Sequence, residues 1–201
     1  DIDFLKTLPR REIICGYGEI LKHSLISNKK FFLFLEQNAS KILDLKTPYI
    51  EKSIKESCLI KKNIIQIDEN EKNLRKVLNF GHTFAHAYEA VLKYSKKLNH
   101  GEAVLLGIMS ASKFSLKQKL LNKNEFELIK NHLTKFKLPN DINNNFTKKN
   151  LNQIISFMEK DKKNNNQKIN LVLLKKIGSP HLGLNFQNKE LHSFLKKELI
   201  N

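Results

Sequence analysis

The chain has 201 residues, of which 40% are apolar, and its formal net charge is +16. It can bury a core as one domain, but no apolar run is long enough to span a membrane, and Cys15 and Cys58 are too few for a disulfide scaffold. Only three of the 36 basic residues are arginine, and the lysines are scattered, without zinc-finger spacing or an RNA-binding aromatic signature. The scarcity of arginine and the missing motifs therefore argue against a nucleic-acid interface. The positive charge would be explained equally by an anionic small-molecule substrate.

Helices dominate the expected secondary structure, because Gly and Pro are scarce and the apolar residues recur at intervals of three and four. We predict helices over residues 11–26, 29–44, 48–67, 71–95, 100–121, 124–136, 148–162 and 188–200. Ser27 and Asn28 can cap the second helix, and Thr47-Pro48 is a typical helix start. The polar stretch 137–147 is expected to form a loop.

One segment predicts β structure. Residues 169–178, INLVLLKKIG, are rich in Ile, Leu and Val and end at Gly178. Because Gly178, Ser179 and Pro180 can turn the chain, we expect either a small hairpin near 169–185 or a buried extended segment. The predicted fold is therefore mainly α, with at most this hairpin.

The sequence lacks a dinucleotide-binding fingerprint. Gly16 and Gly18 give a G-x-G pattern, but Leu21 stands where the third Gly belongs, and no strand precedes the pattern. A nucleotide-binding α/β half is therefore not expected in this chain.

The predicted helix 71–95 has an unusual polar face. Its members are Glu71, Arg75, Asn79, His82 and His86. A solvated face normally shows interchangeable Lys, Glu and Gln, so this mixture indicates a binding site, with an exposed face of chance composition as the alternative.

The two histidines of this face lie one helical turn apart, so both could point into one cavity. Thr83 follows His82, so the pattern is not the HExxH of zinc proteases. Catalytic zinc keeps three protein ligands, and His100 in LNHGEA is a candidate third one. The candidate carboxylates are Glu19, Glu71, Glu89 and Glu102, and spacing alone does not choose between them.

A second pair with the character of a site lies in GYGEILKHS. Glu19 and Lys22 share a helix face beside two glycines, which let a ligand or another backbone approach closely. An ordinary surface ion pair is the simpler alternative.

Three sequence blocks together resemble 3-dehydroquinate synthase. They are LPRREIICGYGEILKHSLI, LIKKNIIQIDENEKNLRKVLNFGHTFAHAYEA and LNHGEAVLLGIMSA, in order and with compatible spacing, within roughly residues 5–180. The resemblance implies that residues 1–201 form the helical, metal- and substrate-binding C-terminal domain of that fold. It also implies that the NAD-binding N-terminal domain of the enzyme is absent from this chain.

The resemblance also implies roles for individual residues. The metal ligands would be Glu19, His82 and His100, with zinc as the expected ion and cobalt as a possible one, while His86 would contact the substrate phosphate. Positions that match substrate-binding residues are Lys22, Lys61, Arg75, Asn79 and Lys162, with Lys163 less favoured. Glu71 would support the site from the family's acidic block.

Three positions depart from the family pattern. Gly18 replaces the usual Ala before the ligand Glu, Ala85 replaces a Gly, and His23 stands where Tyr is common. These are small changes around an intact set of polar residues, so an active site is still expected.

The activity that the resemblance implies is conversion of 3-deoxy-D-arabino-heptulosonate 7-phosphate to 3-dehydroquinate and phosphate, in the shikimate pathway. NAD+ would bind mainly to the N-terminal domain, and the full-length protein would be a cytoplasmic homodimer without nucleic-acid or membrane partners. The chain alone is expected to be inactive. Another sugar-phosphate cyclase, similar to 2-deoxy-scyllo-inosose synthase, is the closest alternative, and a basic nucleic-acid-binding module is a more distant one.

Overall fold

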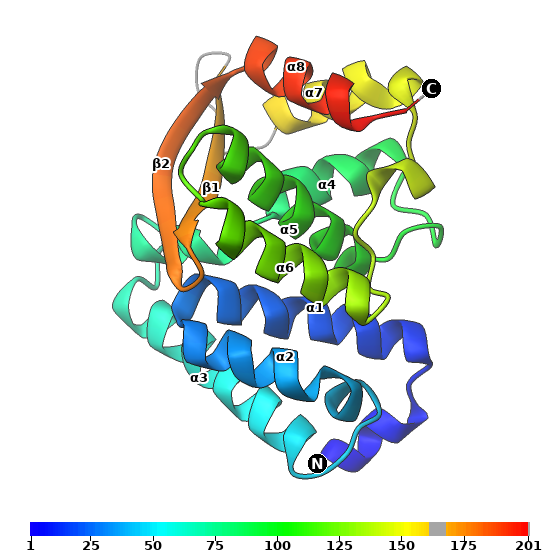
Figure 1. Ribbon diagram of the computed structural model, residues 1–201, viewed down its shortest axis with the longest axis vertical. Coiled ribbons are helices and arrows are strands. Elements are labelled where there is room, and N and C mark those ends of the chain that lie inside the picture. The colour runs from blue at the N-terminus through cyan, green and yellow to red at the C-terminus, as the bar shows by residue number, and fades with distance from the viewer. Residues whose placement is uncertain (161–167, 201) are drawn as a thin grey trace.

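The computed structural model describes residues 1–160 and 168–200, which form a helical body with one small sheet (Figure 1). The helices are α1 (Arg10–Ser27), α2 (Lys29–Leu43), α3 (Tyr49–Ile67), α4 (His82–Val91), α5 (His100–Lys117), α6 (Lys123–Lys135), α7 (Leu151–Glu159) and α8 (Asn188–Glu198). Four short 3-10 helices are η1 (Ile2–Thr7), η2 (Leu74–Asn79), η3 (Ile142–Asn144) and η4 (Lys148–Asn150). The mainly helical fold predicted from the sequence is confirmed. No helix in the described part of the chain is long and apolar enough to cross a membrane.

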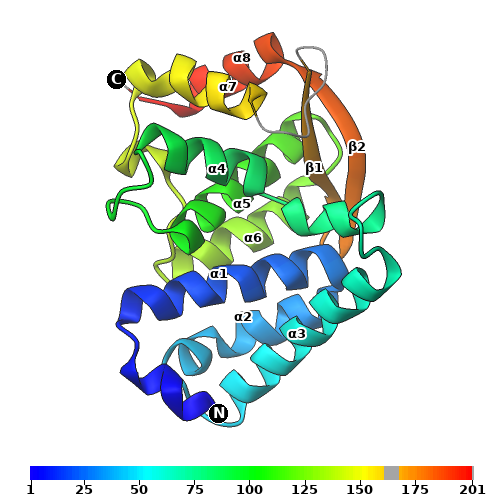
Figure 2. The ribbon, with the colours of Figure 1, turned by 180° about the vertical axis from the view of Figure 1, so that it is seen from behind.

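The helices form two layers that meet along α1 and α5. Helices α1, α2 and α3 lie together at one end of the molecule, and α4, α5 and α6 lie above them, with α7 and α8 covering the far end (Figures 1 and 2). Residues 103–112 of α5 are all buried. A helix that is buried on every side belongs to the core, so α5 is the element against which α1 and α4 are placed.

The predicted hairpin is confirmed. Strands β1 (Lys168–Lys176) and β2 (Ser179–Gln187) pair antiparallel, with Leu171 opposite Leu184. Gly178 turns the chain at φ +83°, in the left-handed region that favours glycine. Its N–H donates to the Leu25 carbonyl at 2.7 Å, which attaches the turn to the end of α1.

The prediction of one continuous helix over 71–95 is wrong. The chain forms η2, then turns at Gly81 with φ +80°, and α4 begins only at His82. A Cβ on Gly81 would lie 2.8 Å from the Ile108 backbone nitrogen of α5, so close packing as well as backbone conformation requires glycine there. The periodicity of the polar residues continues across this break, and so the sequence pattern concealed it.

The remaining boundaries differ by smaller amounts. Asn28 caps α2 as expected, because its side chain accepts the Phe31 N–H at 2.7 Å. The predicted helix 100–121 ends at Lys117, and the predicted helix 148–162 contains η4 followed by α7, with residues 161 and 162 outside the described part. Within the predicted loop 137–147 the chain forms only the short η3, and η1 was not predicted.

Candidate metal and substrate site

Three helices bring one carboxylate and two imidazoles together. Glu19 lies in α1, His82 is the first residue of α4, and His100 is the first residue of α5. One oxygen or nitrogen atom from each side chain lies within 4.8 Å of the other two. The structure therefore gathers the three predicted metal ligands from segments far apart in sequence. Their role as ligands stays a prediction.

Glycine contacts allow these helices to approach. A Cβ on Gly101 would lie 2.3 Å from the Cys15 Cα, and one on Gly18 would lie 3.0 Å from the Gly101 carbonyl oxygen. Between α4 and α5, a Cβ on Gly107 would lie 2.1 Å from the Gly81 carbonyl oxygen. Because a side chain at Gly101 or Gly107 would separate the helices, these glycines fix the spacing of the site.

Glu19 is held as a carboxylate by a buried lysine. Lys22 Nζ donates to Glu19 Oε2 at 2.7 Å, and only 4% of the Lys22 side chain is exposed. Burial alone would raise the pKa of Glu19, but Lys22 outweighs it and holds that pKa below its usual value. The other oxygen, Oε1, is buried and has no hydrogen-bond partner within residues 1–160 and 168–200; it lies 3.6 Å from His82 Nε2, beyond hydrogen-bond range.

The two histidines each use Nδ1 for the protein, which leaves Nε2 for a ligand. His82 Nδ1 lies 3.4 Å from the Phe80 carbonyl oxygen, and His100 Nδ1 lies 3.0 Å from Glu89 Oε2. Burial lowers the pKa of His82 to about 3, so the ring is neutral at neutral pH. A histidine that donates Nδ1–H to a carboxylate or carbonyl is the usual arrangement around a protein-bound metal.

These observations fit a zinc-type ion. The set comprises one ionised carboxylate, whose buried oxygen has no donor in the part of the chain that the structure describes, and two imidazoles whose second nitrogens can point inward. Zinc and cobalt accept this combination of oxygen and nitrogen ligands, with a further position open for substrate.

A cavity of about 320 Å³ adjoins the three residues, and its lining includes three cationic side chains and one amide. Its polar lining includes the predicted residues Lys22, Lys61, Arg75, Asn79 and Glu71. Asn79 Nδ2 donates to Glu71 Oε1 at 2.7 Å, which orients both side chains although no single helix carries them. Four of the five residues of the predicted polar face therefore line one cavity: Glu71 from the loop before η2, Arg75 and Asn79 from η2, and His82 from α4.

His86 faces a neighbouring cavity. Its ring centroid lies 5.5 Å from that of His82, but it shares an opening of about 540 Å³ with Tyr94, Phe157 and Lys160. Among the described residues, the group that could hold a metal consists of Glu19, His82 and His100, which we call the metal-type cluster, and His86 is not part of it. This placement is compatible with the predicted division between a metal ligand and a phosphate contact.

Other residues near the site were missed or fall outside the structure. Lys162 lies outside the described residues, whereas Lys160 of the same lysine-rich run lines the His86 cavity. Glu89 had been considered only as a metal ligand, but it contacts His100 Nδ1 instead. His23 lines the cavity of about 320 Å³, and its Nδ1 lies 2.7 Å from Ser57 Oγ, a contact that was not predicted.

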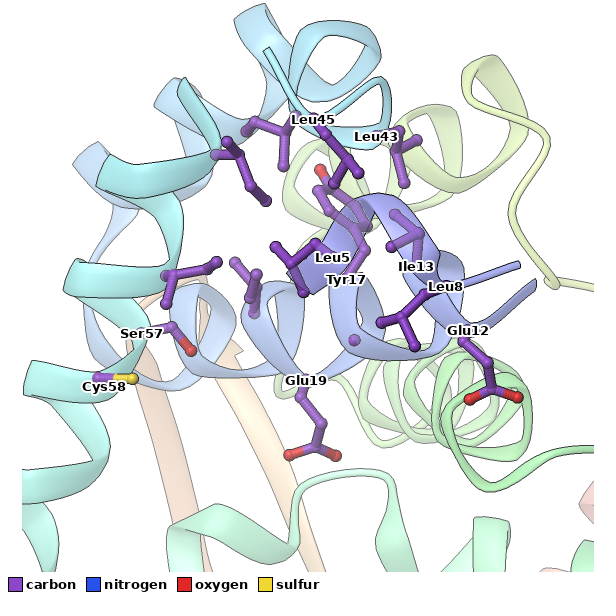
Figure 3. A pocket seen from close by; sticks show the side chains of 15 residues that line it. Leu5, Leu8, Glu12, Ile13, Tyr17, Glu19, Leu43, Leu45, Ser57 and Cys58 are labelled. Carbon is purple, nitrogen blue, oxygen red and sulfur yellow. The ribbon is translucent and has the colours of Figure 1, made fainter. Parts of the chain in front are cut away.

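The opposite face of α1 borders an apolar cavity. It measures about 270 Å³ and is lined mainly by aliphatic side chains from η1, α1, α2 and α3 (Figure 3). Glu19 forms part of its edge, but the carboxylate points away from the aliphatic side chains (Figure 3). Helix α1 thus separates an apolar region from the polar site.

Solved structures share this architecture. The chain superposes on 2-epi-5-epi-valiolone synthase (ValA) from Streptomyces hygroscopicus subsp. jinggangensis 5008, determined with NAD+ and Zn2+ bound, with a TM-score of 0.84 and 21% identity over 98% of this chain and 54% of that one. It matches 2-deoxy-scyllo-inosose synthase, complexed with carbaglucose-6-phosphate, NAD+ and Co2+, with a TM-score of 0.81 and 21% identity over 96% and 54% of the two chains. The fold is therefore that of the dehydroquinate synthase-like cyclases.

Sequence comparison identifies the family within this class. The family described as "3-dehydroquinate synthase C-terminal" matches residues 16–164. The chain is 63% identical over 199 residues to 3-dehydroquinate synthase of Pelagibacter ubique (strain HTCC1062), and 37% identical over 197 residues to that of Thermodesulfovibrio yellowstonii. These alignments cover 99% and 98% of this chain but 54% of each relative, so the chain spans about half the length of the curated relatives it matches. The chain belongs to the 3-dehydroquinate synthase C-terminal domain family.

Proposed function

We propose that this chain is the metal- and substrate-binding part of a 3-dehydroquinate synthase. The full-length protein would convert 3-deoxy-D-arabino-heptulosonate 7-phosphate to 3-dehydroquinate and phosphate, and its N-terminal domain, which this chain does not include, would hold most of the NAD+. The 63% identity to a 3-dehydroquinate synthase supports this substrate choice. As part of the same proposal, the full-length protein is a homodimer.

The observation that carries the proposal is the juxtaposition of the metal-type cluster and the cationic cavity. Glu19, His82 and His100 would hold a zinc or cobalt ion, and Glu19 Oε1 has no hydrogen-bond donor among the described residues. The chemistry that such an ion supplies when bound is Lewis-acid polarisation of a substrate oxygen. The chemistry that NAD+ supplies is reversible removal of a hydride.

The residues of the chain itself bind and orient the substrate. Lys22, Lys61 and Arg75 line the cavity beside the metal-type cluster, where their charges would attract the substrate carboxylate and bond its hydroxyls. His86, Asn79 and Lys162 would bind the phosphate at the other end. Glu71 would keep the Asn79 amide in its binding orientation through their 2.7 Å hydrogen bond.

The test is an assay of the full-length protein with the heptulosonate phosphate and NAD+. We expect equimolar phosphate and 3-dehydroquinate, and loss of both products when Arg75 is replaced by Ala. Since the sequence of this chain has no dinucleotide fingerprint, the chain alone should release neither product. Turnover by the chain alone, or no turnover by the full-length protein, would contradict the proposal.

A second candidate is another sugar-phosphate cyclase. The TM-scores of 0.84 and 0.81 with a valiolone synthase and an inosose synthase favour this class, but identity to each is only 21%. Offering their sugar-phosphate substrates to the same full-length protein separates the candidates. Phosphate release from one of these alone would replace our assignment of the substrate.

A further inference from the structure

Arg11 connects the start of α1 to the start of α5. Its guanidinium donates to both carboxylate oxygens of Glu102, from Nε at 2.7 Å and from Nη2 at 2.5 Å. It also donates from Nη1 to the Lys96 carbonyl at 2.7 Å and from Nη2 to the Lys97 carbonyl at 3.1 Å. Two of these hydrogen bonds reach the first turn of α5, and the other two reach the segment that leads into it.

Glu102, the partner of Arg11, also determines how α5 begins. Its Oε2 accepts the Asn99 N–H at 2.8 Å in a capping box, and His100 is the next residue after that cap. The Asn99 side chain in turn donates to Glu12 Oε1 at 2.7 Å, a second contact with α1. The backbone on both sides of His100 is thus tied to the first turn of α1.

His100 is the most exposed of the three proposed metal ligands. Its side chain is 50% exposed, compared with 14% for His82 and 34% for Glu19. The surrounding side chains therefore constrain it least, and its position depends on the backbone at the start of α5 and on the hydrogen bond to Glu89. Because Glu19 lies on α1 and His100 on α5, any shift between these helices changes the distance between their ligand atoms.

We propose that Arg11 is a positioning residue for the metal site. Its hydrogen bonds to the Glu102 carboxylate and to the Lys96 and Lys97 carbonyls set the separation of His100 from Glu19. The proposal rests on the proposed metal site. A guanidinium makes two parallel bonds to one carboxylate and has donors left for carbonyls, which the single ammonium of lysine does not reproduce.

Arg10 provides a matched control. It is the neighbouring residue on the same helix and has the same chemistry, but it donates to the Leu43 carbonyl and to Asp44 after the end of α2. Replacing Arg10 by Ala removes comparable hydrogen bonds from α1 without releasing α5. A general loss of helix anchoring would affect both variants, whereas loss of metal-site geometry would affect only Arg11→Ala.

The experiment measures zinc affinity by chelator competition in the full-length protein, for wild type, Arg10→Ala, Arg11→Ala and Arg11→Lys. Substitutions of residues that orient metal ligands typically weaken metal binding by about 10–100-fold. We expect a loss in this range for Arg11→Ala, a smaller loss for Arg11→Lys, and wild-type affinity for Arg10→Ala. The absorption spectrum of the cobalt-loaded protein should also change in Arg11→Ala and not in Arg10→Ala.

If Arg11→Ala does not fold, Glu102→Gln is the second variant. It keeps the shape of the side chain but weakens the pair of hydrogen bonds from Arg11, and we expect it to weaken zinc binding as well. Equal zinc affinity in Arg10→Ala and Arg11→Ala, even with a lower melting temperature in the latter, would overturn the positioning role. Wild-type protein that binds no zinc would instead refute the proposed metal site.

Discussion

Two groups of histidines and carboxylates lie along α1, and they are built differently. In the first, Tyr17 of α1 contacts His132 Nε2 at 2.9 Å, His132 Nδ1 contacts Glu36 at 2.6 Å, and Lys135 contacts the other Glu36 oxygen at 2.7 Å. The His132 side chain has no exposed surface, and both of its nitrogens have partners. This network joins α6 to α1 and α2 and leaves no atom of His132 for a ligand.

The second group has the same residue types, but some of their polar atoms have no hydrogen-bond partner among the described residues. Glu19 uses one oxygen for Lys22, and its other oxygen has no donor among the described residues. Among the described residues, His82 and His100 each have a hydrogen-bond partner at Nδ1 and none at Nε2. Because a buried polar atom without a partner costs about 1–3 kcal/mol, the second group is suited to a ligand that satisfies it, whereas the first is complete as a structural network.

The largest loss of zinc is expected from single replacements of Glu19, His82 and His100. In the full-length protein, Glu19→Ala, His82→Ala and His100→Ala should each reduce zinc content to near zero, because each removes one of three protein ligands. His86→Ala should retain zinc and lose phosphate affinity. Elemental analysis after dialysis measures the first effect. Equal zinc loss in all four variants would contradict the division of roles between His82 and His86.

Removing His132 should affect stability and leave the metal site intact. His132→Ala leaves the Tyr17 hydroxyl and the Glu36 carboxylate without their partner and opens a cavity, so we expect a loss of roughly 2–4 kcal/mol in the free energy of unfolding. Tyr17→Phe, which removes only the hydroxyl, should cost less. Denaturant unfolding measures both, and a drop in zinc content in folded His132→Ala protein would show that the two groups are not independent.

The hydrogen bond between Glu89 and His100 is expected to contribute to metal affinity. Glu89→Gln weakens the hydrogen bond to His100 Nδ1 without changing the side-chain shape, and metal affinity should fall by about 10–100-fold. Chelator competition measures this fall. Glu127→Gln is the control, because Glu127 pairs with Lys130 on the surface of α6. Unchanged affinity in Glu89→Gln would mean that the contact does not orient the ligand.

The smallest expected effect is the pH dependence of the first group. Burial lowers the pKa of His132 below its usual 6.5, and for Glu36 the hydrogen bonds from Lys135 and His132 outweigh burial and lower that pKa below 4.5. The unfolded chain therefore binds more protons than the folded one, so stability should be full above about pH 6.5 and fall as the pH drops.

His132→Gln provides the comparison for this pH effect, because it removes the titrating ring. Unfolding measured from pH 7.5 to 4.5 should show a shallower decline for His132→Gln than for wild type. Parallel declines would place the acid sensitivity elsewhere in the chain.

The sequence predicted the helices and the hairpin well, because local periodicity and caps such as Asn28 determine them. It failed at Gly81, where the left-handed backbone and the contact with Ile108 depend on packing against α5. Glu71, Arg75 and Asn79 before that break and His82 after it nevertheless line one cavity, whereas His86 lines the neighbouring one. The regular spacing of these four residues therefore indicated a shared site correctly, although the residues do not lie on a single helix.

For the site, spacing could pair His82 with His86 but could not choose the carboxylate; the resemblance to a known family made that choice. Contacts such as Arg11 with Glu102 connect positions 91 residues apart, and no local pattern reveals them. The role of Glu89 was hidden for the same reason, because it depends on where α5 begins in space.

Anomalous diffraction at the zinc edge, measured on crystals of the full-length protein, would locate the metal and identify its ligands. We predict one zinc ion about 2.0–2.2 Å from an oxygen of Glu19 and from Nε2 of both His82 and His100, with His86 outside its ligand shell. An ion bound jointly by His82 and His86, or the absence of an anomalous peak in zinc-loaded protein, would show that the proposed metal site is wrong.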